Sequence, residues 1–189
     1  MPPRVKFSRE EIIAAALDIV RRGGMAALTA RSLAAELGSS AKPVFGLFEN
    51  MQEVQDEVVR AANAEYQSFL RAEMMRGAYP PYKASGMAYI AFARQEEELF
   101  KLLFMRDRTE EDSETEDESI DGIIALISRN TGLSNEDARL FHLEMWIFVH
   151  GIATMIVTGY LDWEEEYVSR TLTDVYEGLK ARWCGGNGK

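Results

Sequence analysis

Cysteine is almost absent from this sequence. Cys184 is the only one, so the chain cannot form an internal disulfide, and this pattern predicts a cytoplasmic protein. Cys184 lies in a glycine-rich tail, where it is either an incidental thiol or a redox sensor. The first ten residues include Arg4, Lys6 and Arg9 without a following apolar run, so we expect no signal peptide.

Long apolar runs are also lacking. The longest uncharged stretch, residues 145–161, is shorter than the about 20 apolar residues of a membrane-spanning helix. It contains His150, Gly151 and Gly159, which a membrane span rarely combines. We therefore interpret it as a buried helix and expect no membrane contact.

Residues that carry catalysis or bind metals are equally scarce. The two histidines, His142 and His150, lie eight residues apart on a predicted helix, which separates them by about 12 Å along its axis. A shared metal needs ligands one turn apart. Because a glycine-rich phosphate loop, a nucleophile elbow and a cysteine pair are also missing, we expect no metal, no cofactor and no enzymatic activity.

Basic residues are outnumbered, since 21 Lys and Arg against 31 Asp and Glu give a formal net charge of −10. Residues 1–50 nevertheless hold seven basic and five acidic side chains, whereas residues 51–189 hold fourteen and twenty-six. Attraction to phosphate decays within about 10 Å in ordinary salt, so a mildly positive segment can bind DNA although the rest is acidic. Residues 107–118 contain eight acids, which predict a solvated connector or, as the alternative, a metal or partner site.

Strand-like alternation is missing, and apolar residues recur at helical spacing, which predicts an all-α fold. Ser8 and Glu11 form a capping box, Gly23 and Gly24 end the first helix, and Ser134 caps a long C-terminal helix. We expect helices over about residues 8–22, 29–37, 40–47, 51–75, 87–93, 99–105, 120–131, 134–158 and 162–183.

The most informative segment is residues 28–48, where two short predicted helices are joined by a glycine. Thr29 is a good N-cap for the first helix, and Gly38 stands where a helix ends in a left-handed residue. Ser39 or Ser40 can cap the second helix. This is the plan of a helix-turn-helix, whose second helix enters the major groove of DNA.

These residues resemble the N-terminal domain of the tetracycline-repressor (TetR) family over residues 8–53. The Trp146, His150 and Gly151 pattern is similar to one in the C-terminal domain of one branch of that family. The resemblance implies a three-helix DNA-binding head over residues 1–50, a larger helical ligand-binding and dimerisation domain over 51–183, and a flexible tail over 184–189. The matching N-terminal elements are Ile12, Ile13, Gly24, Met25, Thr29 to Gly38, Ser40, Phe45 and Phe48.

We predict that the helix over about residues 40–47 reads DNA. It departs from the family pattern, because Phe45 replaces the usual Tyr, Leu47 a frequent His, and Met51 a common Lys. Pro43 fits only because it lies in the first turn. Phe45 either contacts DNA or packs in the core. The predicted contacts are Thr29 and Arg31 to phosphates, with Ser40, Ala41, Lys42, Phe45 and Gly46 on the reading helix.

Residues 80–160 are rich in methionine and aromatic side chains, which predicts a mostly apolar ligand pocket or, alternatively, a well-packed core. A buried histidine or indole N–H there needs a partner, which a ligand or water would supply. The acidic body favours a neutral or cationic apolar compound. The predicted ligand contacts are Met87, Phe92 and Phe104, together with a stripe one turn apart on one helix formed by His142, Trp146 and His150.

The last two long helices show more apolar surface than one subunit can bury, which predicts a homodimer built from them. The candidate interface residues are Met145, Ile152, Met155, Ile156 and Tyr160 on one helix, and Leu172, Val175, Tyr176 and Leu179 on the other.

Together these features predict a ligand-responsive, DNA-binding transcriptional regulator. TetR-like proteins mostly repress, so the resemblance implies a repressor released from its operator by a small apolar molecule. The alternative is a helical dimeric interaction protein whose DNA-reading head has lost specific binding.

Overall fold

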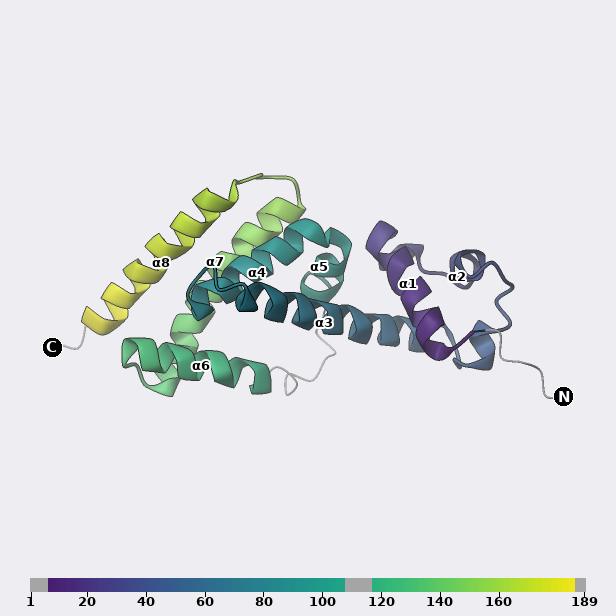
Figure 1. The fold of residues 1–189 in the computed structure, drawn as a ribbon, viewed down its shortest axis with the longest axis horizontal. Helices are drawn as coiled ribbons and strands as arrows, with labels where there is room; N and C mark the ends of the chain where they lie inside the picture. The colour runs from purple at the N-terminus through teal and green to yellow at the C-terminus, as the bar shows by residue number, and fades with distance from the viewer. Residues whose placement is uncertain (1–6, 108–116, 186–189) are drawn as a thin grey trace. The chain divides into compact units, whose positions relative to one another are not determined.

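The computed structural model describes residues 7–107 and 117–185. These residues contain no strand, which confirms the all-α fold with a helix-turn-helix head (Figure 1). The elements are α1 (Arg9–Gly23), η1 (Met25–Ala27), α2 (Ala30–Glu36), η2 (Val44–Gly46), α3 (Met51–Met75), α4 (Pro81–Gln95), α5 (Glu97–Phe104), α6 (Asp117–Thr131), α7 (Asn135–Val157) and α8 (Glu165–Gly185).

Contacts divide the chain into two compact units. Unit 1 comprises residues 1–68 and 95–106, and unit 2 comprises residues 69–94 and 107–189. The division differs from the predicted boundary at residue 50, because α5 packs on α1 and most of α3 stays with the head. The chain passes from unit 1 to unit 2 inside α3, returns to unit 1 where α4 ends, and enters unit 2 again after residue 106. The boundary between the DNA-binding and ligand-binding functions remains a prediction.

Unit 1 is organised around α1. Its apolar residues recur every three or four positions, so Ile12, Ala16 and Val20 are fully buried on one face. Helices α2 and α5 pack on α1. The other fully buried side chains of this unit are Leu33, Val44, Val54, Val58, Ala62, Leu99 and Phe100.

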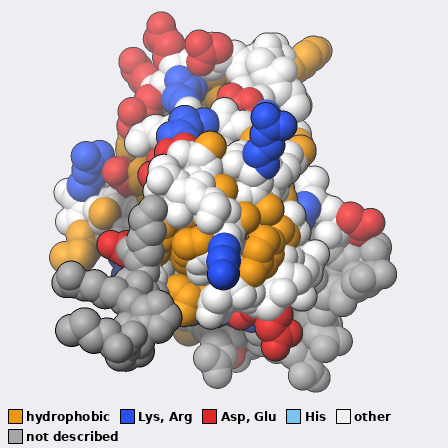
Figure 2. Space-filling model, turned by 90° about the vertical axis from the view of Figure 1, so that its right-hand side faces the viewer, with side chains coloured by type: hydrophobic (Ala, Val, Ile, Leu, Met, Phe, Trp, Pro, Cys, Tyr) orange, Lys and Arg blue, Asp and Glu red, His pale blue; other side chains and the backbone are white. Residues whose placement is uncertain are grey.

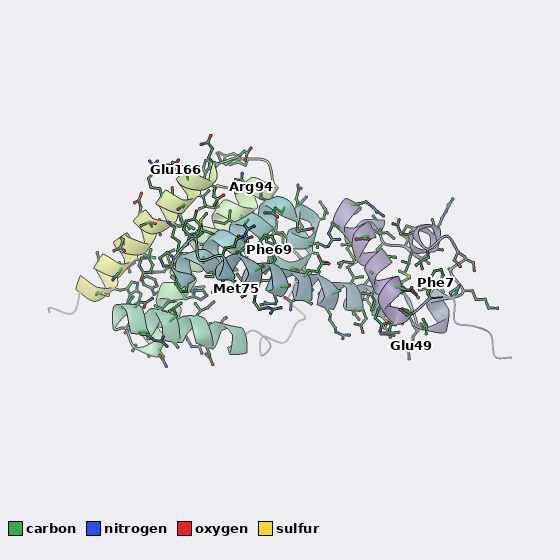
Figure 3. The ribbon with its side chains drawn as sticks, in the orientation of Figure 1. Phe7, Glu49, Phe69, Met75, Arg94 and Glu166 are labelled. Carbon is green, nitrogen blue, oxygen red and sulfur yellow. The ribbon has the colours of Figure 1, made fainter. Side chains whose placement is uncertain are left out.

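Unit 2 is built on α7, which packs against α6 and α8. A core cluster joins Ile124, Ile127, Ala138, Phe141 and Met145, and side chains of α4 and α8 pack against it. Phe69 of α3, labelled in Figure 3, contacts the ring of Phe92 of α4 edge-on, with 5.5 Å between the ring centroids.

Two predicted C-terminal boundaries need correction. The last helix begins at Glu165 rather than at residue 162, because Arg94 binds the Asp162 carboxylate and the Trp163 carbonyl and holds this lead-in outside the helix (Figure 3). Cys184 belongs to the last turn of α8 rather than to a flexible tail. Residues 186–189, and residues 108–116 of the acidic segment, lie outside the described part of the chain.

By length and composition α7 could cross a membrane, but the core helix of a soluble protein meets the same criteria. Phe141 and Ala153 on its inner face are fully buried within unit 2. This single helix therefore does not indicate a membrane protein.

Candidate DNA-binding head and ligand site

Local capping positions the elements of the head. The Ser8 hydroxyl accepts a hydrogen bond from the Glu11 N–H while the Glu11 carboxylate accepts one from the Ser8 N–H, which confirms the predicted capping box. Thr29 caps α2 in a similar exchange with Ser32. These caps satisfy N–H groups that the helices themselves leave unpaired.

The turn after α2 is a Schellman motif. Gly38 has a φ of 57°, its N–H donates to the Ala35 carbonyl at 3.0 Å, and the Ser39 N–H donates to the Ala34 carbonyl at 2.9 Å. The left-handed residue predicted at Gly38 is therefore confirmed, and it turns the chain sharply from α2 into the reading segment.

The reading segment itself is shorter than predicted. Instead of an α-helix over residues 40–47, it forms the 3₁₀ helix η2 with no side-chain cap at its start. Pro43 lacks an N–H and Gly46 has a low helix propensity, so regular helical bonding does not extend across the segment. We call residues 39–48 the reading turn.

The reading turn buries two apolar side chains and exposes a third. Val44 is fully buried and Phe48 is 2% exposed, whereas Phe45 is 46% exposed. The alternative that Phe45 packs in the core therefore does not hold. The other predicted DNA contacts are exposed or half-buried: Thr29, Arg31, Ser40, Ala41, Lys42 and Gly46.

The cations on the helices and the reading turn of unit 1 fall into two groups. Arg9, Arg21, Arg22, Arg60 and Lys101 each pair with at least one carboxylate within the unit. Arg31 and Lys42, by contrast, are exposed and form no ion pair within the described residues. Figure 2, which faces α1 and α2, shows hydrophobic side chains gathered near the centre of this face with Lys and Arg side chains close by.

Two arginines at opposite ends of α1 fix the head. The Arg9 guanidinium binds Glu53 at 2.8 Å and Glu57 at 3.0 Å, and it donates to the Leu47 carbonyl at 2.9 Å. The same guanidinium lies 4.2 Å from the centroid of the Phe48 ring. Arg9 thereby connects α1 to both the end of the reading turn and the start of α3.

Arg21 performs a similar role at the other end of α1. It binds Glu65 of α3, Glu96 just before α5 at 2.9 Å, and Asp18 at 2.8 Å. Glu65 lies close in sequence to the point where the chain leaves unit 1 inside α3, and Glu96 lies close to the point where the chain returns to unit 1 after α4. Arg21 therefore holds these two segments to α1.

In unit 2, α4 and α7 are joined by two Tyr–His hydrogen bonds. The Tyr82 hydroxyl and His142 Nδ1 are 3.1 Å apart, and the Tyr89 hydroxyl and His150 Nδ1 are 2.8 Å apart. Burial lowers the pKa of both histidines below the usual 6.5 and raises the pKa of Tyr82, so these groups stay uncharged at neutral pH. Tyrosines thus supply the partner that we expected from a ligand or water.

The remaining predicted ligand residues are distributed over both units. Met87 is 8% exposed and Phe92 is 1% exposed in unit 2. Trp146 stacks on His150 with 4.9 Å between ring centroids and is 42% exposed. Phe104 belongs to unit 1, where its ring contacts those of Tyr66 and Phe100.

The outer face of α7 is unusually apolar. Leu140, Leu143 and Ile147 recur at helical spacing and are 47%, 50% and 59% exposed, and Met155 continues this face. Several residues that we predicted for a dimer interface are instead in the core, since Met145, Ile152 and Leu172 are no more than 6% exposed. Because α7 is apolar on more than one face, its sequence does not show which face packs in the core and which face is exposed.

The Tyr–His hydrogen bonds of unit 2 and the ion pairs of Arg9 and Arg21 were not predicted from the sequence. Tyr82 and Tyr89 are seven residues apart on α4, and His142 and His150 are eight residues apart on α7. This similar spacing is the one feature of the sequence that could have suggested the two Tyr–His pairs. Nothing in the sequence separates the paired Arg9 and Arg21 from the unpaired Arg31. No group of metal-ligating side chains large enough to hold an ion occurs in the described ranges.

Comparisons with known proteins agree with this architecture. The family described as "Tetracyclin repressor-like, C-terminal domain" matches residues 82–176. An HTH-type transcriptional regulator of Mycobacterium tuberculosis is 27% identical over 169 residues, which cover 83% of this chain and 73% of that protein.

Solved structures share the fold. A TetR-like transcriptional regulator from Rhodococcus sp. RHA1 is similar over the whole of both chains, with 15% identity and a TM-score of 0.62. The multidrug binding protein EbrR, solved in complex with imidazole, is similar over 91% of this chain and 92% of its own, with 20% identity and a TM-score of 0.60.

Proposed function

Because this chain belongs to the TetR family of transcriptional regulators, we propose that unit 1 binds an operator in double-stranded DNA and that a small apolar molecule releases it. The DNA-binding part of this proposal rests on which exposed Arg and Lys side chains of unit 1 form ion pairs and which do not. Arg31 in the first turn of α2 and Lys42 in the reading turn have no carboxylate partner among the described residues, whereas Arg9 and Arg21 of the same unit are neutralised. Unpaired exposed cations are the groups that bind phosphate.

The DNA-binding proposal is tested by a mobility shift with the DNA that flanks the protein's own gene. We expect the full chain to retard this fragment and the Arg31→Ala, Lys42→Ala double variant to lose the shift. Arg60→Ala is the matched control, because Arg60 is equally cationic and exposed but pairs with Glu57 on α3. Equal binding by the double variant and the wild type would overturn this assignment.

We place the ligand in unit 2, in the region of α4 and α7, with Met87, Phe92, His142, Trp146 and His150 as contacts. Support comes from the surroundings of the histidines, where two uncharged Tyr–His pairs lie among apolar side chains. Ligand sites commonly combine an apolar lining with a few polar groups. EbrR, described as multidrug binding, has a similar fold, which favours a broad class of apolar compounds rather than an anionic metabolite.

The proposed release couples the ligand to the head through continuous chain. Helix α3 runs from Met51 at the end of the reading turn into unit 2, and α4 leads directly into α5. A ligand that binds the DNA-free form more tightly shifts the equilibrium by about 1.4 kcal/mol for each tenfold loss of DNA affinity. The Arg21 ion pairs would transmit a movement of α3 or α5 to α1.

Ligand release is tested in two steps. A library of neutral and cationic apolar compounds is screened for an increase in the melting temperature of the full chain. Compounds that stabilise it are then added to the DNA complex, and we expect them to lower its affinity. Arg21→Ala should retain the thermal shift but show a smaller loss of DNA affinity. A library without any stabilising compound would contradict the ligand proposal but not the DNA proposal.

We further propose a homodimer formed through the last two helices, as is typical of the family. The exposed apolar face of α7, with Leu143 and Ile147 at its centre, supports α7 as the main contact. A two-fold dimer presents two reading heads, which suits a palindromic operator. Such a regulator acts in the cytoplasm, where the DNA is accessible.

One observation favours the alternative, a helical dimeric interaction protein that no longer reads DNA. The reading helix is reduced to the three-residue 3₁₀ helix η2, and Lys42, two residues before η2, is the single cation of the reading turn. The mobility shift also decides this question, because a dimer in sedimentation without a DNA shift supports the alternative.

A further inference from the structure

The exposed surface of the reading turn has an unusual chemistry. Phe45 is 46% exposed although its neighbours Val44 and Phe48 are buried. Ala41 and Pro43 are half-buried, and Gly46 is exposed. A Cβ atom at Gly46 would meet nothing within 4 Å, so the space beside Phe45 is open.

The turn is held firmly behind this ring. The Phe48 N–H donates to the Val44 carbonyl at 3.0 Å, and Arg9 both donates to the Leu47 carbonyl and covers the Phe48 ring. The Val44 N–H donates to the Ala41 carbonyl at 3.1 Å. Phe45 is therefore presented on a preorganised backbone, which lowers the entropy lost when it binds a partner.

The polar groups of the turn limit what it can recognise. Base edges are read by Arg or Lys at guanine, Asn or Gln at adenine, Asp or Glu at cytosine, Ser or Thr at more than one base, and apolar side chains at the thymine methyl group, so the serines of the turn do not specify a single base. Residues 39–48 contain no Arg, Asn, Gln, Asp or Glu. Lys42 is the single cation, and Phe45 is the large apolar side chain that faces outward.

From this arrangement we propose that Phe45 contacts the 5-methyl group of a thymine in the major groove and creates a preference for thymine at one position in each half-site. The inference rests on the proposed DNA-binding function and adds its base preference. It commits to DNA as the partner because unpaired Lys42 lies three residues from Phe45 on the same turn, where it can bind a neighbouring phosphate.

The test removes single methyl groups from the DNA. An operator is first selected from random double-stranded DNA with the full chain, and each thymine is then replaced by deoxyuridine, which differs only by that methyl group. Affinity is measured by fluorescence anisotropy. At one position in each half-site we expect a loss of about fourfold, the effect of one buried methyl-sized group, and about 15-fold when both half-sites are changed.

Phe45→Ala identifies the side chain responsible. We expect this variant to bind the thymine and deoxyuridine operators equally, whereas Phe45→Leu, which keeps an apolar side chain, retains part of the discrimination. Selective binding by the wild type with no effect of deoxyuridine at any position overturns the inference and leaves the DNA-binding function intact. A deoxyuridine effect that persists in Phe45→Ala also overturns it. Failure to select any sequence overturns both proposals.

Discussion

The two phenylalanines of the reading turn offer a direct test of its structure, because they lie three residues apart and have opposite surroundings. Phe48 is 2% exposed and its ring contacts the Arg9 guanidinium, whereas Phe45 is 46% exposed. Phe48→Ala should therefore remove a buried ring and leave a cavity between α1 and α3, and Phe45→Ala should leave the packing unchanged.

The two substitutions should change the free energy of unfolding by clearly different amounts. Truncation of a buried phenylalanine costs about 3–5 kcal/mol, which is a large part of the about 5–15 kcal/mol that stabilises a typical domain. With a urea dependence of roughly 2 kcal/mol per molar, Phe48→Ala should lower the unfolding midpoint by about 2 M. Phe45→Ala should change the free energy of unfolding by less than about 0.5 kcal/mol.

The assay is urea unfolding of the full chain followed by far-ultraviolet circular dichroism, which reports both units. Tryptophan fluorescence alone is unsuitable, because Trp146, Trp163 and Trp183 all belong to unit 2. Equal destabilisation by the two substitutions would refute the assignment of Phe45 to the surface. A neutral Phe48→Ala would refute the packing of the reading turn against α1.

Three further predictions concern charge, assembly and pH. Lys42→Ala should reduce the slope of log affinity against log salt by about one for each reading head, whereas Arg60→Ala should leave the slope unchanged, and equal slopes in anisotropy titrations would count against Lys42 as a phosphate contact. Leu143→Glu together with Ile147→Glu should convert the dimer to a monomer in sedimentation; a wild-type mass near the 21.3 kDa of one chain at micromolar concentration would contradict the dimer. Burial lowers the pKa of His142 in the folded protein, so the unfolded chain takes up the proton first and the free energy of unfolding should fall as the pH drops below 6.5. His142→Asn should weaken this pH dependence of the free energy of unfolding. An identical pH profile in the variant and the wild type would argue against a role of His142.

Local features of the head could be predicted from the sequence alone. Ser8, Thr29 and Ser134 cap helices as expected, and Gly38 adopts the left-handed conformation at the turn. Each of these depends on residues fewer than six positions apart, so short-range patterns contain the necessary information. The same holds for α3, whose bounds, Met51–Met75, match the prediction.

Features that depend on tertiary contacts could not be predicted. The outward-facing apolar residue of the reading turn is set by tertiary packing, which buries Val44 and Phe48 and leaves Phe45 exposed. The inward face of α7 could not be chosen from a helix that is apolar on several sides. The partners of His142 and His150 lie some 60 residues away on α4, and no local pattern identifies them.

Hydroxyl-radical footprinting is the most direct test of whether the protein binds operator DNA as a dimer with two DNA-binding heads. The full chain is bound to the DNA that flanks its own gene, and protection is mapped at single-nucleotide resolution. If the dimer binds through both heads, we expect two protected half-sites on one face of the duplex, with their centres about 34–36 Å apart or a multiple of this distance. Uniform protection without discrete half-sites, or no protection at protein concentrations that saturate non-specific DNA, would contradict it.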